Sequence, residues 1–188
     1  RDLHLSIRRQ RQMCIRDRGR LGSIHADNIL NKMKGGKLIA ACSLNNTELI
    51  QIKNRINRIK CYNDFNQMIN TCKLDGVIIV SSSDQHCKHS MIALNKGLHV
   101  FCEKPLGTNL NECLKIKKLV NSQKDLIFML GFMRRYDPSY IYLKKKVDEG
   151  IIGMPILFRG YSVDPESLIS NSIKLNFIFC PFFTTFVV

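Results

Sequence analysis

Three consecutive residues that could take part in a reaction, Glu103, Lys104 and Pro105, follow an apolar run in the segment HVFCEKPLGTN (99–109). An acid and a base at the end of a buried strand can move a proton or stabilise a developing charge. Pro105 fixes its own φ and can follow a cis bond, which would turn the chain sharply and hold Lys104 in place. The alternative interpretation is a surface ion pair beside a loop proline.

A second group of residues has part of the pattern of a phosphate-binding loop. In GRLGSIHADNIL, Gly19 and Gly22 have the spacing of the last two glycines of G-x-G-x-x-G. The backbone N–H groups that include those of Arg20 and Leu21 would receive a pyrophosphate at the helix N-terminus. The first glycine would stand where Asp17 is, and RQMCIRDR replaces the expected apolar strand. The motif is therefore half present, and a strand–helix–strand setting must support it.

The segment CSLNN (42–46) follows the next apolar run. Dinucleotide-binding folds place an acid at this point, where it holds the adenosine ribose. Ser43 and Asn45 are the candidates here, and no carboxylate stands beside them to repel a 2′-phosphate. Both NAD and NADP remain possible cofactors on this interpretation.

Strand and helix patterns alternate through the middle of the chain, as expected for βαβ units. The apolar runs are typical of strands buried on both faces. They lie near 37–43, 75–81, 98–102 and 126–131, and we expect them to be adjacent and parallel. In the helix after Gly19, we expect Ile24, either Asn28 or Ile29, and Met33 to share one face. The next expected features are a helix stop at Gly97 and an N-cap at Thr108 or Asn109. The sequence thus predicts an α/β fold with a doubly wound, Rossmann-like parallel sheet.

The two ends differ from this pattern. Residues 1–18 contain six arginines and no regular period, and MCIRDR resembles a translated sequencing adaptor. We expect a non-native or disordered segment there, without a well-packed strand, because buried arginines would lose hydration. The alternative is that a sheet edge recruits MCIR as a strand. Residues 19–135 would form the dinucleotide-binding domain. Residues 136–188 would begin a truncated α/β substrate domain, with the pattern unreliable after about 175.

Composition narrows the class of protein. The net charge is +14, but the lysines are scattered and no aromatic residues interleave them, so nucleic-acid binding ranks lowest. Eight cysteines without a C-x-x-C pair indicate reduced thiols of a cytoplasmic protein, and His86, Cys87 and His89 lack a further ligand for zinc. We expect no bound metal and no contact with membranes.

The motifs together resemble a known family. GLHVFCEKPLGTN (97–109), SSSDQHCKHSMIALNKG (81–97) and the segment 131–160 are similar to the Gfo/Idh/MocA family of nicotinamide oxidoreductases. His86 lies 17 residues before Glu103, as the family pattern has it, and the likeness covers about residues 19–174. The last segment resembles the inositol 2-dehydrogenase branch of the family.

The resemblance implies hydride transfer from a secondary hydroxyl of a cyclic polyol or sugar to NAD or NADP. Lys104 would be catalytic, contacting the hydroxyl and stabilising the alkoxide. Glu103 would face the nicotinamide ribose, and the intact protein would be a homo-oligomer. The other implied cofactor contacts are Ser81, Ser83, His86, Met133 and Arg134.

One part of the family pattern is missing. The resemblance implies a histidine base partnered by an aspartate in the second domain, but the five histidines stand at 4, 25, 86, 89 and 99. We therefore expect a chain truncated at both ends and inactive by itself. The alternative function is a non-catalytic dinucleotide-binding module, which would keep the crevice without turning over substrate.

Overall fold

A six-stranded parallel sheet, with the order β3-β2-β1-β4-β5-β6, forms the centre of the first of two compact units, Arg1–Phe132 and Met133–Val188. The computed structural model describes residues 11–16, 19–159 and 185–186. The strands of the sheet are β1 (Arg11–Arg16), β2 (Gly36–Cys42), β3 (Lys60–Tyr62), β4 (Gly76–Ile79), β5 (His99–Cys102) and β6 (Phe128–Leu130). The predicted doubly wound α/β fold is confirmed.

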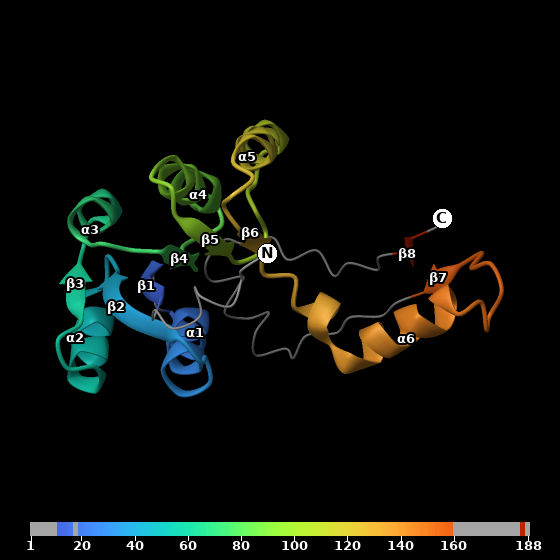
Figure 1. Cartoon of the computed structure of the whole chain (residues 1–188), viewed down its shortest axis with the longest axis horizontal. Helices are drawn as coiled ribbons and strands as arrows, with labels where there is room; N and C mark the ends of the chain where they lie inside the picture. Colours follow the sequence, from blue (N-terminus) through green and yellow to red (C-terminus); the bar gives the residue numbers. More distant parts are fainter. Residues whose placement is uncertain (1–10, 17–18, 160–184, 187–188) are drawn as a thin grey trace, which may run out of the picture. The chain divides into compact units, whose positions relative to one another are not determined.

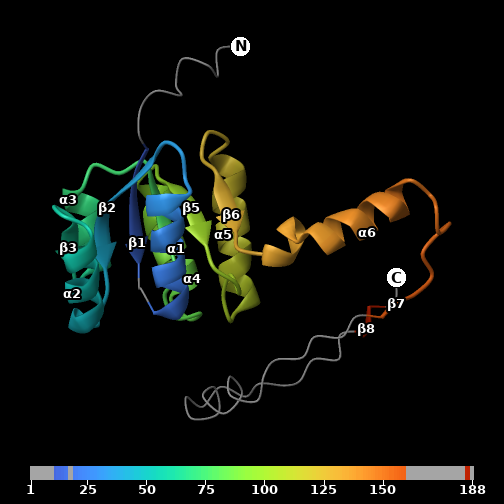
Figure 2. The ribbon, with the colours of Figure 1, turned by 90° about the horizontal axis from the view of Figure 1, so that it is seen from below.

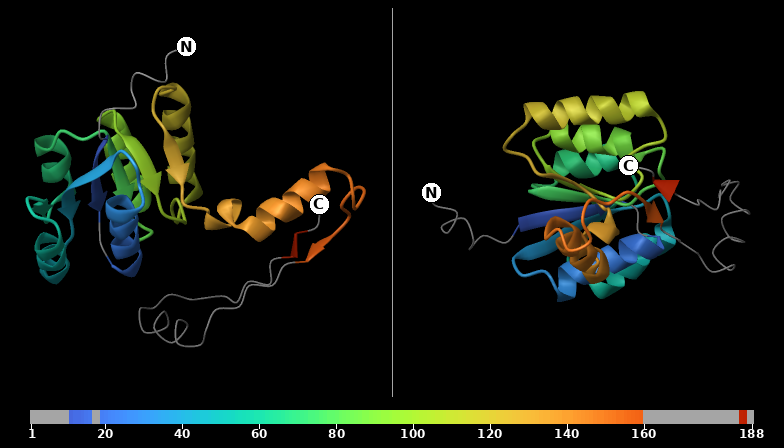
Figure 3. Two further views of the ribbon diagram at one scale, coloured as in Figure 1. Left: turned by 60° about the horizontal axis from the view of Figure 1, so that its bottom comes forward. Right: turned by 90° about the vertical axis from the view of Figure 1, so that its right-hand side faces the viewer.

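Helices cover the sheet in two layers, with α1 and α2 on one face and α3, α4 and α5 on the other (Figures 1 and 3). Their bounds are α1 (Arg20–Asn31), α2 (Asn46–Arg55), α3 (Phe65–Thr71), α4 (His86–Asn95) and α5 (Leu110–Ser122). Each layer packs on its own apolar cluster, because alternate strand residues point to opposite faces. Cys14 and Val77 join the α3–α5 cluster, whereas their neighbours Ile15 and Ile78 join the α1–α2 cluster.

The four predicted strands are present and parallel, but they are not all adjacent. β1 lies between β2 and β4, with Ile15 opposite Ala41 on one side and Ile78 on the other. The short strand β3, which pairs with β2, was not predicted. The direction of the strands was therefore predicted correctly from the sequence, but the number of strands was predicted too low.

The prediction that residues 1–18 contain no well-packed strand is wrong for residues 11–16. Cys14 and Ile15 are fully buried in β1, at the middle of the sheet. The arginines stand at the two ends of this strand, and the Arg11 side chain stays 53% exposed, 4.0 Å from Asp75. Burial of the strand interior therefore does not require burial of the Arg11 charge. Residues 1–10, 17 and 18 lie outside the described part of the chain.

The predicted face of α1 is also partly wrong. Ala26 and Ile29 are buried against the sheet, whereas Ile24 and Met33 are about half exposed. Gly22 is buried with Ala26, so small residues let α1 lie close to the strands. Two end signals are confirmed in the same unit: Asn109 caps α5, and Gly97 has a φ of +74° just after α4.

The second unit contains a short 3₁₀ helix η2 (Met133–Tyr136), α6 (Pro138–Asp148), β7 (Phe158–Arg159) and β8 (Thr185–Phe186). β7 and β8 pair antiparallel, and α6 begins at an Asp137 cap followed by Pro138. The segment 160–184, which is part of the predicted substrate-domain start (136–188), lies outside the described residues. Among the described helices, none is both long and apolar enough to cross a membrane.

Candidate functional site

The carboxyl ends of β1, β4 and β5 lie at the same edge of the sheet, because the three strands are adjacent and parallel. Figure 2 shows the sheet from the face that carries α1 and α2, and in this view β5 and β6 lie beside α1. The loops that follow these strand ends carry Gly19, Ser81 and Glu103. The Glu103 N–H donates to the carbonyl of Ile79 at 2.9 Å, which extends the ladder to the point where the acid begins. The fold thus places three separate motifs at one edge.

Gly19 is the N-cap residue of α1, and helix hydrogen bonding begins there, with the Ser23 N–H donating to its carbonyl at 3.2 Å. In the described part of the chain no side chain caps this helix, and its first turn contains no acid. The first turn comprises Arg20, Leu21 and Gly22, whose backbone N–H groups lie at the positive end of the helix dipole. An anion fits this end of α1. The predicted position of the first motif glycine, Asp17, is outside the described residues.

A carboxylate does reach the end of β2, contrary to the expectation from the sequence. The Ser43 hydroxyl donates to Glu48 Oε2 at 2.7 Å and accepts from the Asn45 N–H at 3.0 Å. Asn45 caps α2 by accepting from the Thr47 N–H at 3.0 Å. Ser43 is 1% exposed, so it positions the Glu48 carboxylate more readily than it could contact a ligand itself. The polar group offered here is an acid from the first turn of α2.

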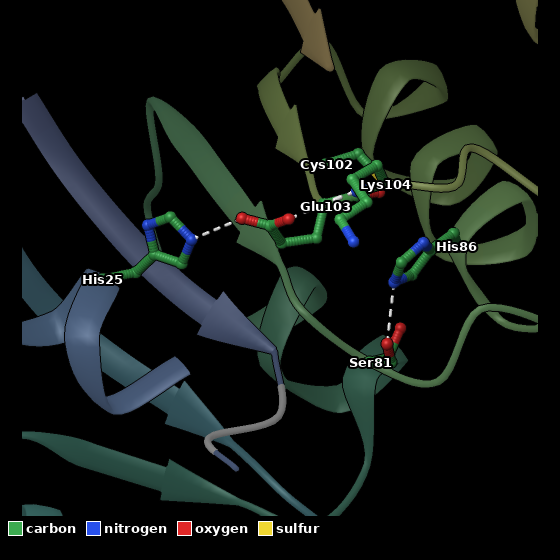
Figure 4. Close-up of polar contacts among 6 residues, drawn as sticks. All are labelled: His25, Ser81, His86, Cys102, Glu103 and Lys104. Carbon is green, nitrogen blue, oxygen red and sulfur yellow. Dashed lines mark hydrogen bonds and ion pairs between the residues drawn. The ribbon is translucent and has the colours of Figure 1, made fainter. Parts of the chain in front are cut away.

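His86 is 2% exposed and connects two loops at the strand ends. Its Nε2 lies 2.7 Å from the carbonyl oxygen of Ser81 (Figure 4). Its Nδ1 lies 2.6 Å from the carbonyl oxygen of Pro105. Ser81 Oγ is also 3.1 Å from Nδ1 of His89. The His86 ring therefore supports the loop after β4 and the loop after β5 from within, and its place beside a cofactor stays a prediction. Ser83 is half-buried in the first of these loops.

Glu103 is directed toward α1. Its Oε1 lies 2.7 Å from Nε2 of His25, and its Oε2 accepts from the Lys104 N–H at 3.3 Å (Figure 4). The side chains of Glu103 and His25 are only 12% and 20% exposed. In the view of Figure 4, the Lys104 ammonium group is drawn between the Glu103 carboxylate and the His86 ring. Lys104 is exposed, its bond to Pro105 is cis, and no ion pair to it occurs within the described residues.

Met133 and Arg134 belong to the second unit, where their described contacts also lie. Met133 is 65% exposed in η2. The Arg134 Nη1 donates to Asp137 Oδ2 at 2.9 Å, and its guanidinium lies 5.5 Å from the centre of the Tyr140 ring. These contacts fix Arg134 to the start of α6, and a role for either residue beside a nicotinamide stays a prediction.

Two hollows border the described residues. One of about 560 Å³ lies along the sheet face beside α1, with His25 and Phe101 in its lining. The other, about 810 Å³, follows α6 within the second unit and has no strand end in its lining. The first hollow adjoins His25, and the second has Arg134 in its lining.

Two residues of this site, His25 and Glu48, were not found from the sequence. Glu48 stands three residues after the N-cap Asn45, the spacing of a capping box, which could have indicated that it turns back toward β2. His25 stands three residues after Gly22, one helical turn into α1. Its contact with Glu103 joins residues 78 positions apart, and no local pattern announces it.

Comparison with known proteins agrees with this arrangement. Residues 18–132 match GFO_IDH_MocA, described as an oxidoreductase family with an NAD-binding Rossmann fold. An inositol 2-dehydrogenase/D-chiro-inositol 3-dehydrogenase from Halalkalibacterium halodurans is 33% identical over 149 residues, which are 79% of this chain and 43% of that protein. The chain spans less than half the length of this curated relative.

Two solved structures are similar over most of the chain. The myo-inositol 2-dehydrogenase of Lactobacillus plantarum is 42% identical, with a TM-score of 0.85 over 89% of this chain and 49% of that one. The scyllo-inositol dehydrogenase of Lactobacillus casei, solved with NAD(H) and scyllo-inositol, is 39% identical with the same TM-score and the same two coverages. Both structural matches cover 89% of the chain, which is more than the stretch 18–132 that the family model matches.

Proposed function

Because this chain belongs to the GFO_IDH_MocA oxidoreductase family, with its NAD-binding Rossmann fold, we propose that it is the cofactor-binding part of an NAD-dependent polyol dehydrogenase. The whole protein would oxidise a secondary hydroxyl of inositol or a related cyclic polyol, as the names of its relatives indicate. The observation that carries the proposal is the placement of Gly19 and of Glu103-Lys104 at one edge of the sheet, after the carboxyl ends of β1 and β5, which lie on either side of β4.

The residues present fit a dinucleotide. The uncapped first turn of α1, from Arg20, would hold the pyrophosphate through backbone N–H groups. Glu48, positioned by Ser43, would bind the adenosine ribose diol and repel a 2′-phosphate, which favours NAD over NADP. When bound, the nicotinamide supplies the acceptor for the hydride. Ser81 and Ser83 would border its path, and Met133 and Arg134 would lie toward the substrate.

Lys104 would act on the substrate hydroxyl. Its ammonium group is a compact donor that stabilises negative charge developing on oxygen as the hydride leaves. Lys104 is exposed at the strand end and has no ion pair within the described residues, so its charge is available to a ligand. Glu103 would orient the chain at this point instead of contacting the substrate.

A base that accepts the hydroxyl proton is not provided by a second-domain histidine here, since all five histidines precede residue 100. The 188 residues alone would therefore bind cofactor weakly and oxidise no polyol. The cysteines within the described residues, seven in number, are free thiols, which supports a reducing compartment such as the cytoplasm. The whole protein would be a homo-oligomer.

The proposal is tested by titrating the isotope-labelled chain with NAD⁺ and NADP⁺ and following backbone amide shifts. NAD⁺ should move amides at 20–23, 43–48 and 81–83, and NADP⁺ should bind about tenfold more weakly because Glu48 faces its 2′-phosphate. Glu48→Gln should remove this difference. Lys104→Met should leave NAD⁺ affinity within about twofold, because the lysine acts on the substrate.

Other outcomes would contradict the proposal. Absence of shifts at millimolar NAD⁺, or shifts confined to other surfaces, would exclude a dinucleotide site at these strand ends. Robust formation of NADH from inositol by the chain alone would show that a base exists among its residues. Cofactor binding by the intact protein without any turnover would favour the alternative, a non-catalytic dinucleotide-binding module.

A further inference from the structure

We propose that His25 is a positioning residue of this site. It holds the Glu103 carboxylate against α1 and so prevents that carboxylate from pairing with the neighbouring Lys104 ammonium group. The inference rests on the proposed function in one respect, namely that Lys104 is the residue that meets the substrate oxygen.

The first step is that both oxygens of the Glu103 carboxylate already have hydrogen-bonding contacts. One of its oxygens lies 2.7 Å from His25 Nε2, and the other accepts from the Lys104 backbone N–H at 3.3 Å. At 12% exposure the carboxylate has little water around it, so these two contacts supply most of its hydrogen bonding. Within the described residues, the Lys104 ammonium group makes no hydrogen bond or ion pair with either oxygen.

The second step is that the fold holds the carboxylate in this orientation. The His25 ring packs on Phe101, with the ring centres 5.1 Å apart and the planes inclined by 60°. Ala26, the next residue of α1, is buried against the sheet and fixes the helix beneath the ring. A Cβ atom at Gly131, the residue that follows β6, would lie 3.2 Å from Cδ of Glu103, so the chain leaving β6 approaches the carboxylate closely. Three elements thus enclose one acid.

The third step is the consequence for Lys104. Glu103 and Lys104 are consecutive, so a carboxylate released from His25 could rotate toward the ammonium group beside it. An ion pair would stabilise the charged form of the lysine and occupy its donors. A lysine engaged in this way is a weaker donor toward a substrate oxygen. By holding Glu103, His25 leaves the Lys104 charge uncompensated where it is needed.

The competing explanation is that the His25–Glu103 contact only ties α1 to the sheet. The two explanations differ in what happens to Lys104 when the contact is removed without loss of packing. His25→Phe keeps an aromatic ring on Phe101 and removes the hydrogen bond. His25→Gln keeps a donor that can reach Glu103.

The experiment measures the acetylation rate of Lys104 in the full chain, using N-hydroxysuccinimidyl acetate and peptide mass spectrometry. The reagent attacks only the neutral amine, and at about pH 8 lysine amines are mostly protonated. An ion pair that stabilises the protonated form leaves less neutral amine and should slow labelling about tenfold. We expect His25→Phe to slow Lys104 by roughly that factor and His25→Gln to restore the wild-type rate. Lys32, the residue after α1, and Lys144 of α6 serve as internal controls whose rates should not change.

A double-mutant cycle separates positioning from structural support. In a Glu103→Gln background no carboxylate is left to rotate, so His25→Phe should no longer slow Lys104. An equal slowing in that background, or a Lys104 rate within twofold of wild type in His25→Phe, would overturn the inference. If the phenylalanine variant does not fold, His25→Leu in both backgrounds makes the same comparison.

The readout requires neither cofactor nor turnover. A chain that shows the labelling pattern but does not bind NAD⁺ would refute the proposed function and leave the coupling of His25, Glu103 and Lys104 intact. A chain that binds NAD⁺ but shows no coupling would refute the role of His25 alone.

Discussion

The two units of the chain hold their helices in different ways. In the first unit the helices contribute side chains to a close-packed interior, as Met68, Leu94 and Ile116 do at 0%, 0% and 1% exposure. In the second unit α6 has no buried residue, and Ile141 is 52% exposed. The first unit is stabilised by long-range burial, and the described part of α6 by local contacts.

Those local contacts in the second unit can be identified individually. Asp137 caps the start of α6, and Lys144 pairs with Asp148 one turn along the helix. Exposed pairs of this kind contribute a few tenths of a kcal/mol each, whereas one buried aliphatic side chain contributes about 1.5–3 kcal/mol. The comparison teaches where a precise site can be built: the acid and base at the strand ends belong to the unit with the rigid interior.

The largest expected effect comes from a matched pair of substitutions. Ile15→Ala, at a fully buried position in β1, should lower the free energy of unfolding by about 2–5 kcal/mol. Ile141→Ala, at a half-exposed position in α6, should change it by less than about 0.5 kcal/mol. Urea unfolding followed by far-ultraviolet circular dichroism measures both. Equal effects would contradict the difference between the two units. An Ile15→Ala variant with unchanged stability would show that β1 does not contribute to the core.

A second pair of substitutions compares two glycines, one in each unit. A Cβ at Gly107 would lie 2.6 Å from Sγ of Cys87, so Gly107→Ala should destabilise the fold by about 1–3 kcal/mol through overpacking. Gly150 meets no atom within 4 Å but has a φ of +72°, so Gly150→Ala should cost about 1 kcal/mol of backbone strain.

Only the first of these costs should be relieved by removing the sulfur. Cys87→Ala should rescue Gly107→Ala and leave Gly150→Ala unchanged in the same unfolding assay. Burial raises the pKa of the Cys87 thiol to about 12, so the thiol stays neutral and the rescue should not depend on pH near neutrality. A Gly107→Ala variant that Cys87→Ala fails to rescue would show that the clash lies elsewhere.

The sequence predicted the sheet well because alternation and apolar runs are local signals. It missed β1 because the count of arginines outweighed the short pair Cys14–Ile15, whose burial depends on neighbours distant in sequence. It chose the wrong face of α1 because Ile24 and Met33 are more apolar than Gly22 and Ala26, although only small residues allow the close approach.

The residues of the candidate site also differ in whether a local sequence pattern indicates them. Gly19 and the Glu103-Lys104 pair could be predicted as site residues because strand ends and glycine spacing can be read along the chain. Glu48 and His25 were not found because each acts through a partner that folding brings near. His86 was placed in a cofactor channel, but its burial beneath two loops depends on the carbonyls of Ser81 and Pro105, which no sequence pattern indicates.

The smallest expected effect concerns the cap of α6 and its dependence on pH. Asp137 accepts from Arg134 and from the Ser139 N–H, both at 2.9 Å. The hydrogen bond from Arg134, followed by the one from Ser139, holds the pKa of Asp137 below its ordinary value of 3.8. A lowered pKa in the folded state means that the cap contributes fully above pH 3.8 and is lost as the pH falls through the lowered value.

Acidification should therefore fray the start of α6 before it affects the first unit, where Asp64 caps α3 but Phe65 and Met68 also anchor that helix by burial. Amide hydrogen exchange at residues 139–142, corrected for intrinsic rates, should rise as the pH falls below 3.8. Asp137→Asn keeps a capping side chain that does not titrate, so its exchange should stay flat over that range. The other two acids at this helix, Asp148 and Glu149, are present in both proteins, so their contribution cancels in the difference. An identical rise in Asp137→Asn would assign the pH dependence to those two acids, and α6 would then be held from its carboxyl end instead of from its cap.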